Sequence, residues 1–330
     1  MTTWHQQAEE VSIGAALDKV LQVSSDLTRA MNTVIEGKED VVRTTVTALL
    51  AEGHLLIEDV PGVGKTMLAK TLAKTIDCTV RRIQFTPDLL PSDITGVSVY
   101  NQDLRSFEFR PGAVFANVVV GDEINRASPK TQSALLEAME EAQVTVDGTT
   151  YALPHPFMVM ATQNPIEMEG TYPLPEAQRD RFLARISMGY PPPHAETDML
   201  DTHSADSPLD RLQPVTDAAT ISDLILSVRR VHASLAIRQY IVDLAHATRT
   251  SSALRLGASP RATLHLLRAA RAHAALKGRD HVLPDDVQHV LAEVWAHRVI
   301  LSGEAHLARR SPEDVLDDLA HRTRVPGARR

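Results

Sequence analysis

Residues Glu58-Asp-Val-Pro-Gly-Val-Gly-Lys-Thr66 form a glycine-rich loop that decides how this chain folds. The loop follows an apolar run of strand type, 54–60, and precedes a helical stretch, 65–76. A strand, a glycine loop and a helix in this order are the context of a phosphate-binding loop of the Walker A type. Gly62 and Gly64 let the backbone turn its N–H groups inward, where they hold phosphate oxygens together with the helix N-terminus.

Two side chains of the loop add chemistry to this cradle. Lys65 is expected to reach the β- and γ-phosphates, and the hydroxyl of Thr66 to ligate Mg²⁺. Asp59 stands where the full motif has its first glycine, and the alternative is a glycine-rich turn with a chance Lys-Thr pair. The residues expected around the phosphates are Asp59, Val60, Pro61, Gly62, Val63, Gly64, Lys65, Thr66 and Met67.

The composition is that of a globular protein of 330 residues, with 43% hydrophobic and 23% charged side chains. No apolar run approaches the roughly 18 residues that a membrane-spanning helix requires. Residues 1–10 lack the charged-then-apolar pattern of a secretion signal, so we expect a cytoplasmic protein. A single cysteine, Cys78, excludes an internal disulfide and a zinc site with several cysteine ligands.

Acidic residues outnumber basic ones by 42 to 34, and the net charge of −8 argues against a dedicated nucleic-acid-binding protein. The charge is uneven, because residues 229–279 contain ten Lys and Arg but only one acid, Asp243. This basic stretch is either a solvated helical face with arginines beside acidic neighbours, or a surface that meets a nucleotide, a partner or an adjacent subunit.

Alternating strand and helix signals predict an α/β fold up to about residue 190. Buried strands are expected at 54–60, 79–85, 117–122, 157–162 and 184–190. Strands that are apolar on both faces indicate a parallel sheet covered by helices on two sides. Strand signals are lacking after Pro191–Pro193, and helices are expected near 215–231, 236–250, 260–276, 284–299 and 311–320. The expected domains are an N-terminal helical segment (1–33, helical from 11), an α/β core (34–193) and an all-α domain (194–330).

Two more strands end in polar residues with a chemical interpretation. Val118-Val-Val-Gly-Asp-Glu123 places Asp122 where it would hold Mg²⁺ and Glu123 where it would act as general base toward the attacking water. Asn164, at the end of the strand before Pro165, would hold the lytic water or touch the γ-phosphate. The alternatives are an acidic strand end without a metal and an ordinary Asn-Pro turn.

Together these motifs resemble an AAA+ ATPase, and in particular the MoxR family. The resemblance covers about residues 30–300 and rests on the stretches 58–66, 85–96, 121–127, 161–165 and 174–178. A residue other than glycine is usual in that family at the position of Asp59. The resemblance implies a P-loop NTPase core with the sheet order 5-1-4-3-2, followed by an all-α lid, and it implies ATP and Mg²⁺ as cofactors.

The family also carries an insert in the second helix of its core, which the resemblance places at about 96–111. It places a hairpin before the strand that ends at Asn164, at 144–153, where Asp147-Gly148 between alternating segments independently predicts a β-turn. Such hairpins usually face the pore or the top of a ring. The alternative is a simple extension of the sheet.

Three further site positions follow from the resemblance. Arg181, beside a second cation at Arg179, matches the arginine finger that points at the γ-phosphate of the neighbouring subunit; its alternative is a pair with Asp180 or Glu176. Arg261 matches the sensor 2 arginine, which would contact phosphate in cis or across the subunit boundary, and its alternative is an exposed first-turn arginine.

The third position is the adenine site, which the family places near Val34, Ile35 and Gly37; an ordinary helix boundary is the alternative there. ATP would then bind between the core and the lid. The resemblance implies a homo-oligomeric ring, a hexamer, that remodels or matures partner proteins, often ones with von Willebrand factor A domains.

Two rival functions stay open at this point. One is a DNA-directed AAA+ motor, because minichromosome maintenance helicases share the insert-bearing core. The other is a nucleotide-dependent switch or scaffold without hydrolysis. Net acidity counts against the motor, and the presence of Glu123, Asn164 and Arg181 counts against the switch.

Overall fold

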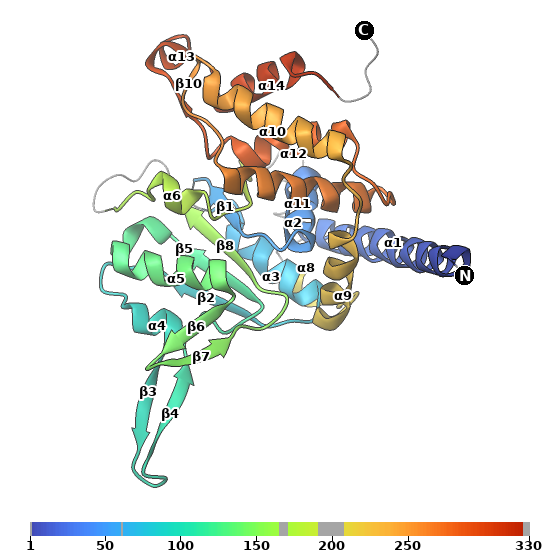
Figure 1. Ribbon diagram of the computed structural model, residues 1–330. Coiled ribbons are helices and arrows are strands. Elements are labelled where there is room, and N and C mark those ends of the chain that lie inside the picture. The colour runs from blue at the N-terminus through green and yellow to red at the C-terminus, as the bar shows by residue number, and fades with distance from the viewer. Residues whose placement is uncertain (1, 61, 165–170, 191–207, 326–330) are drawn as a thin grey trace.

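The computed structural model describes residues 2–60, 62–164, 171–190 and 208–325, and it consists of an α/β core followed by a helical lid (Figure 1). The helices up to the end of the core are α1 (Thr2–Asn32), α2 (Glu39–Leu50), α3 (Lys65–Thr75), α4 (Pro91–Thr95), the 3₁₀ helix η1 (Ile124–Arg126), α5 (Pro129–Glu141) and α6 (Glu176–Arg179). The strands of the core are β1 (Leu55–Glu58), β2 (Val80–Gln84), β3 (Gly96–Asn101), β4 (Ser106–Pro111), β5 (Val118–Asp122), β6 (Gln143–Val146), β7 (Thr149–Ala152), β8 (Met158–Gln163) and β9 (Ala184–Ile186).

Five strands form the central sheet in the order β2-β5-β8-β1-β9, and every neighbouring pair is parallel. Counted along the chain as strands 1 to 5, this is the order 5-1-4-3-2, so the expected topology is confirmed. All five strands end at the same side of the sheet, the carboxyl end, and all begin at the opposite side, the amino end. This distinction decides which site residues can meet within one chain.

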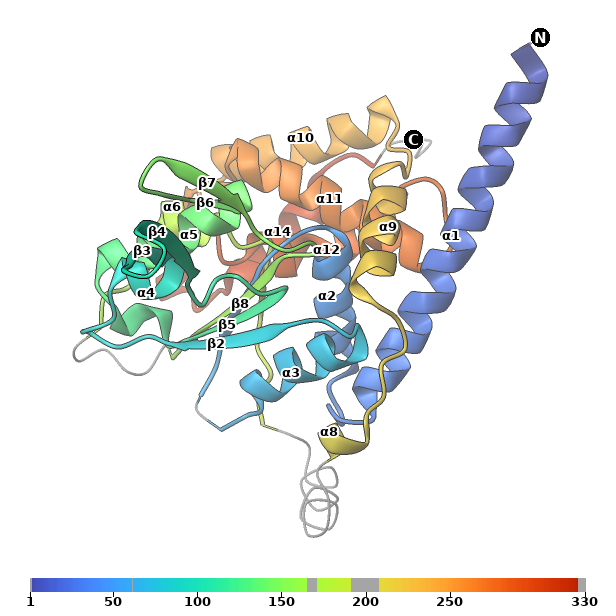
Figure 2. The ribbon, with the colours of Figure 1, turned by 90° about the horizontal axis from the view of Figure 1, so that it is seen from below.

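Alternate strand residues pack into two separate hydrophobic cores. Leu55 and Ile57 of β1 join α2 and α3 on one face, whereas Leu56 joins α4 and α5 on the other. Figure 2 shows α3 and α5 on opposite sides of β2, β5 and β8. Because successive strand side chains point to opposite faces, a strand buried on both sides is apolar throughout. The two-sided cover expected from the sequence is therefore present.

Two antiparallel hairpins extend from the core, β3–β4 and β6–β7. The β3–β4 hairpin spans 96–111, the segment that the sequence singles out, and the β6–β7 hairpin spans 143–152, one residue earlier at each end than the expected 144–153. Asp147 and Gly148 have φ angles of 50° and 79°, the left-handed backbone that a two-residue hairpin turn requires. The β3–β4 hairpin projects away from the rest of the molecule (Figure 1).

The lid follows the core and is helical. Its elements are α8 (Pro208–Arg211), α9 (Ala218–Arg229), α10 (Leu235–Thr250), β10 (Leu254–Leu256), α11 (Pro260–Leu276), α12 (Pro284–Trp295), β11 (Ile300–Leu301), α13 (Gly303–Leu307) and α14 (Pro312–Arg322). Ser259 shows why α11 begins where it does, since its side chain accepts a hydrogen bond from the Ala262 N–H and Pro260 occupies the first helical position.

The expectation of an all-α lid needs one correction, because β10 and β11 pair as a small antiparallel sheet. Strands of three and two residues are too short to show a periodic pattern in the sequence. A second difference is that α12 ends at Trp295 instead of reaching residue 299. His297 and Arg298 leave the helix to bind backbone carbonyls of the core.

Helix α1 begins at Thr2, earlier than the expected start at residue 11. Its buried side chains Leu17, Val20, Leu27 and Met31 recur at helical spacing, and the helix packs against α2 and α3 of the core and α9 and α11 of the lid. Its N-terminal end extends past the other elements (Figure 2). None of the helices in the described ranges combines the length and apolarity that crossing a bilayer requires.

Candidate active site

The glycine-rich loop connects β1 to α3 at the carboxyl end of the sheet; Pro61 lies outside the described residues. Gly62 and Gly64 have φ angles of 86° and 91°, which glycine adopts without steric cost. Gly64 is the N-cap of α3 and has no side chain to bind the first amides of the helix. The first N–H groups of a helix have no acceptor within the helix itself, so the start of α3 is suited to an anion such as phosphate.

Asp59 stands where the full loop motif has its first glycine, and its side chain accepts hydrogen bonds that a glycine could not. The side chain is 8% exposed, and its Oδ1 accepts the N–H of Val60 at 2.9 Å. Its Oδ2 accepts the Ser187 hydroxyl at 3.1 Å and the Gly189 N–H at 2.6 Å. Asp59 therefore fastens the start of the loop to the chain that leaves β9. The ammonium of Lys65 donates to the Asp59 carbonyl at 2.7 Å.

Asp122 lies directly across from the loop, at the end of β5. Thr66 Oγ1 is 3.4 Å from Asp122 Oδ2, and Thr162 Oγ1 donates to Asp122 Oδ1 at 3.2 Å. A hydroxyl and a buried carboxylate are the hard oxygen ligands that Mg²⁺ takes beside phosphate oxygens and water, so the residues present fit this ion. Arg82 Nε also donates to Asp122 Oδ2, at 2.5 Å, a partner that the sequence did not reveal.

Glu123 follows Asp122 and turns out of the strand. It has φ 58° and ψ 49° and caps the 3₁₀ helix η1, and its N–H donates to Thr162 Oγ1 at 2.9 Å. Its Oε2 accepts from Gln84 Nε2 at 2.9 Å and pairs with Arg126 Nε at 3.2 Å. Gln84 was missed by sequence reasoning. The register of the sheet would have found it, because Gln84 stands opposite Asp122 in the β2–β5 pair.

Asn164 follows β8, which lies between β5 and β1 in the sheet. Asn164 is 6% exposed and lies at the carboxyl end, between the acidic pair that follows β5 and the loop that follows β1. Pro165, its neighbour in the motif, is outside the described residues. The sheet therefore brings the three motif positions, Lys65-Thr66, Asp122-Glu123 and Asn164, to one place.

The expected adenine segment joins this same end of the molecule. Gly37 has φ 68°, while Ile35 is 5% exposed and Val34 packs against the core between α1 and α2. Lys38 Nζ donates to the carbonyl of Tyr190 at 2.8 Å, next to the Gly189 that Asp59 binds. The segment 34–38 is therefore linked to the phosphate loop through the chain that leaves β9.

Arg181 and Arg261 lie at the amino end of the sheet, away from the phosphate loop of their own chain. Leu183, just before β9, donates its N–H to the carbonyl of His54, just before β1, at 2.8 Å. Arg181 pairs with Glu140 at 3.1 Å, and Arg261 binds the other oxygen of the same carboxylate. Among the described residues, Arg181 pairs with neither Asp180 nor Glu176, the two alternatives expected from the sequence.

His54, close to this cationic pair, is buried and neutral. His54 donates from Nε2 to the Met139 carbonyl at 3.0 Å, and its Nδ1 accepts the Val159 N–H at 3.0 Å. Burial lowers the pKa of His54 to about 4, partly opposed by the Met139 contact. A cavity of about 200 Å³ adjoins these residues and is lined by both arginines, Glu140 and Arg268.

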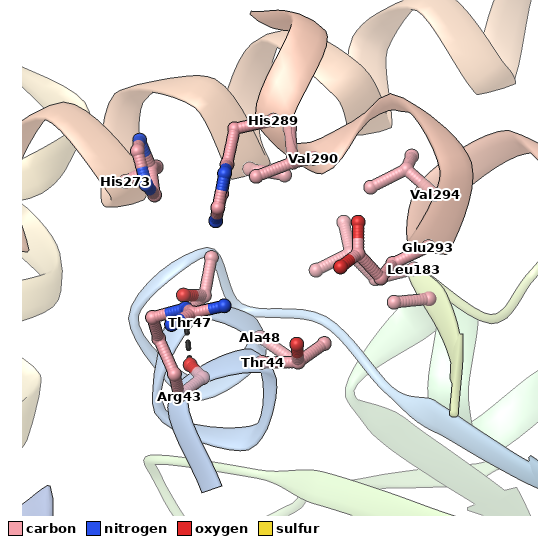
Figure 3. Close-up of a pocket in the computed structure, with 12 residues that line it drawn as sticks. Arg43, Thr44, Thr47, Ala48, Leu183, His273, His289, Val290, Glu293 and Val294 are labelled. Carbon is pink, nitrogen blue, oxygen red and sulfur yellow. Dashed lines mark hydrogen bonds between the residues drawn. The ribbon is translucent and has the colours of Figure 1, made fainter. Parts of the chain in front are cut away.

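A small pocket lies between α2 and the lid helices α11 and α12 (Figure 3). Arg43 and Thr47 line it from α2, and His273, His289 and Glu293 line it from α11 and α12. Its volume of about 20 Å³ fits roughly one water molecule and no nucleotide. Burial raises the pKa of Glu293 and lowers that of His289.

Comparison with known proteins matches the chain to two domain families. Residues 54–184 match the ATPase family associated with various cellular activities (AAA), and residues 246–326 match the AAA lid domain. A solved structure from Cytophaga hutchinsonii, described as a candidate ATPase, has a TM-score of 0.87 at 36% identity and covers 97% of this chain and 99% of that one. The fold is that of an AAA+ ATPase with a helical lid.

Relatives along most of the chain narrow this class. The chain is 42% identical over 302 residues to Chaperone MoxR1 of Mycobacterium tuberculosis, with 89% of this chain and 80% of that protein covered. It is 34% identical over 330 residues to Protein MoxR of Paracoccus denitrificans (92% and 96% covered) and 50% identical over 296 residues to YeaC of Bacillus subtilis (90% and 92% covered). The chain belongs to the MoxR family of AAA+ ATPases.

Proposed function

We propose that this chain hydrolyses ATP at sites shared between neighbouring copies in a ring, a hexamer, and uses the reaction to remodel or mature partner proteins. One observation carries the proposal. The phosphate loop lies at the carboxyl end of the sheet, whereas Arg181 and Arg261 converge on Glu140 at the amino end. A strand rises about 3.3 Å per residue, so the length of β1 alone separates the two groups by about 10 Å. The cations are therefore suited to the γ-phosphate of another chain.

Within one chain, the carboxyl end holds the nucleotide and prepares the water. The α3 amides and Lys65 bind the phosphates, and the 34–38 segment contacts the adenine. A bound Mg²⁺, held by Thr66 and Asp122, would neutralise charge on the phosphates. Glu123 accepts the proton of the attacking water, which Asn164 orients. Phosphoryl transfer depends on such positioning and on charge stabilisation more than on covalent chemistry.

The neighbouring chain supplies the missing positive charge. A cation at the γ-phosphate accelerates related reactions by roughly 10³–10⁵. In the isolated chain, Glu140 satisfies both Arg181 and Arg261. We infer that the triphosphate of the adjacent subunit takes over this role in the ring, so that assembly completes the site.

Contacts that cations of the basic stretch 229–279 make within the chain favour protein remodelling over the DNA-directed alternative. Arg229 binds Glu52 with two nitrogens, Arg279 binds Asp286, and Arg249 donates to a backbone carbonyl. These three cations are thus held by groups of the same chain, with the Arg229 side chain still 59% exposed. The M. tuberculosis relative is also named a chaperone. We propose a cytoplasmic protein whose partners include von Willebrand factor A domain proteins.

The proposal is tested by mixing two inactive variants. Arg181→Ala alone should bind ATP normally and lose hydrolysis, because each site lacks its incoming cation. Glu123→Gln alone should bind ATP and lose hydrolysis, because each site lacks its base. Mixed rings should regain activity, since an Arg181→Ala chain keeps Glu123 and can receive Arg181 from a Glu123→Gln neighbour. Absence of any rescue in rings shown to be mixed would contradict a shared site.

A further inference from the structure

Arg298, a lid residue after α12, is bound to the backbone on both sides of Arg181. Its side chain is 2% exposed, and its Nε donates to Asp180 Oδ1 at 2.9 Å. Its terminal nitrogens donate to the carbonyls of Asp180 at 3.1 Å, of Leu183 at 3.0 Å and of Phe182. One lid guanidinium thus fixes the segment from which Arg181 projects.

The second oxygen of Asp180 connects the same segment to Arg261. Ser259 Oγ donates to Asp180 Oδ2 at 2.8 Å and accepts the Ala262 N–H at 3.0 Å as the N-cap of α11. Arg261 is the second residue of that helix. Asp180 therefore joins the segment bearing Arg181 to the helix start bearing Arg261.

Within this connection Arg298 is charged, whereas the neighbouring His265 is neutral. Burial lowers the pKa of Arg298 to about 10, with Asp180 opposing the shift, so Arg298 is a cation at neutral pH. Burial and the nearby arginines lower the pKa of His265 to about 2, so its neutral ring accepts from Arg298 at Nδ1. His297 adds a contact to the Phe182 carbonyl at 3.1 Å.

We propose that Arg298 is a positioning residue that makes the lid and the two cations, Arg181 and Arg261, move as one body. This inference rests on the proposed shared site. A guanidinium that binds Asp180, Phe182 and Leu183 leaves the 180–183 segment little freedom to shift without the lid. Any movement of the lid then changes where both cations point in the site of the neighbouring chain.

Arg298→Lys tests this, because lysine keeps the charge beside Asp180 but lacks the planar fork that reaches several carbonyls. The variant should bind ATP with unchanged affinity at its own site and lose roughly tenfold to a hundredfold in kcat, the effect of a misplaced reacting group. Mixing it with Glu123→Gln chains should restore hydrolysis. Arg310→Lys is the matched control, since Arg310 pairs with Asp318 inside the lid, and its kcat should not change.

The outcomes separate this inference from the proposed function. A normal kcat for Arg298→Lys overturns it, and so does a defect that Glu123→Gln chains fail to rescue while they do rescue Arg181→Ala. Failure of the Arg181→Ala rescue itself would instead overturn the shared site. If Arg298→Lys does not fold, Asp180→Asn serves in its place, because it removes the charge that pairs with Arg298 Nε, and it should show the same loss of kcat and the same rescue.

Discussion

The side-chain amide of Gln84 donates a hydrogen bond of 2.9 Å to Oε2 of Glu123. Arg126 pairs with the same oxygen at 3.2 Å, and the Glu123 N–H is held by Thr162. Glu123, the proposed base, is thus held by residues from three different elements, two of which contact its carboxylate. Gln84 is the last residue of an outer strand, so it joins the base to a strand that carries none of the recognised motifs.

Gln84→Ala should lower kcat about tenfold and leave the ATP dissociation constant within about twofold, because the base loses orientation while the phosphate cradle is untouched. Steady-state hydrolysis and nucleotide titration measure the two quantities. Gln239→Ala, an exposed glutamine of the lid, is the control. Weaker ATP binding at normal kcat would mean that Gln84 contributes to binding instead.

Asp59→Gly should destabilise the protein even though it restores the more common glycine of the loop motif. The substitution removes the acceptor of three hydrogen bonds, from Val60, Ser187 and Gly189. Leaving buried donors unpaired costs about 1–3 kcal/mol each at most, and part of this is recovered by relaxation. Denaturant unfolding and ATP titration should both show a loss. Wild-type stability and affinity would show that the tie to the β9 exit is dispensable.

Arg82→Ala should lower the Mg²⁺ concentration needed for half-maximal hydrolysis. Arg82 occupies Asp122 Oδ2, the oxygen that also faces Thr66, so it competes with the cation. The Arg82 side chain is 56% exposed, so this pair is worth about 1 kcal/mol or less and the shift should be at most about fivefold. Arg81→Ala is the control, because Arg81 donates to the Gly112 carbonyl. A higher Mg²⁺ requirement would contradict the competition.

His54 should make stability fall as the pH decreases from 6.5 to 4. Its pKa is lowered from 6.5 to about 4 in the folded protein, so in this window the unfolded chain binds a proton that the folded chain excludes. The free energy of unfolding therefore rises with pH across the window, by about 3 kcal/mol, and levels off below pH 4.

The check is His54→Asn, whose amide oxygen can still accept the Val159 N–H. This variant should be less stable at pH 7.5 but should show a flatter dependence of unfolding free energy on pH between 6.5 and 4. His265, whose pKa is lowered first by burial and by Arg298, titrates in both proteins, and His54 contributes only a smaller part of its shift. Parallel pH profiles for the two proteins would contradict the assignment.

The features that could be predicted are those that a short stretch of sequence determines. The loop at Gly62–Thr66, the acidic pair at Asp122-Glu123 and the lid helix that begins after Ser259 each depend on neighbouring residues. The sheet order came from the family resemblance, because strand spacing does not say which strands pair. Gln84, Arg82 and Arg298 were missed since each acts through a residue more than 30 positions away. Nothing local distinguishes them from other polar side chains.

The nucleotide loop and the two cations lie at opposite ends of one sheet. This arrangement determines how many complete sites a given number of chains can form. If copies join by matching one end to the other, the contact is head to tail, and such contacts either close on themselves or continue as an open row. An open row always has one fewer complete site than it has chains, and a single chain has none. Turnover per chain should therefore rise with concentration and reach its maximum only when the assembly closes.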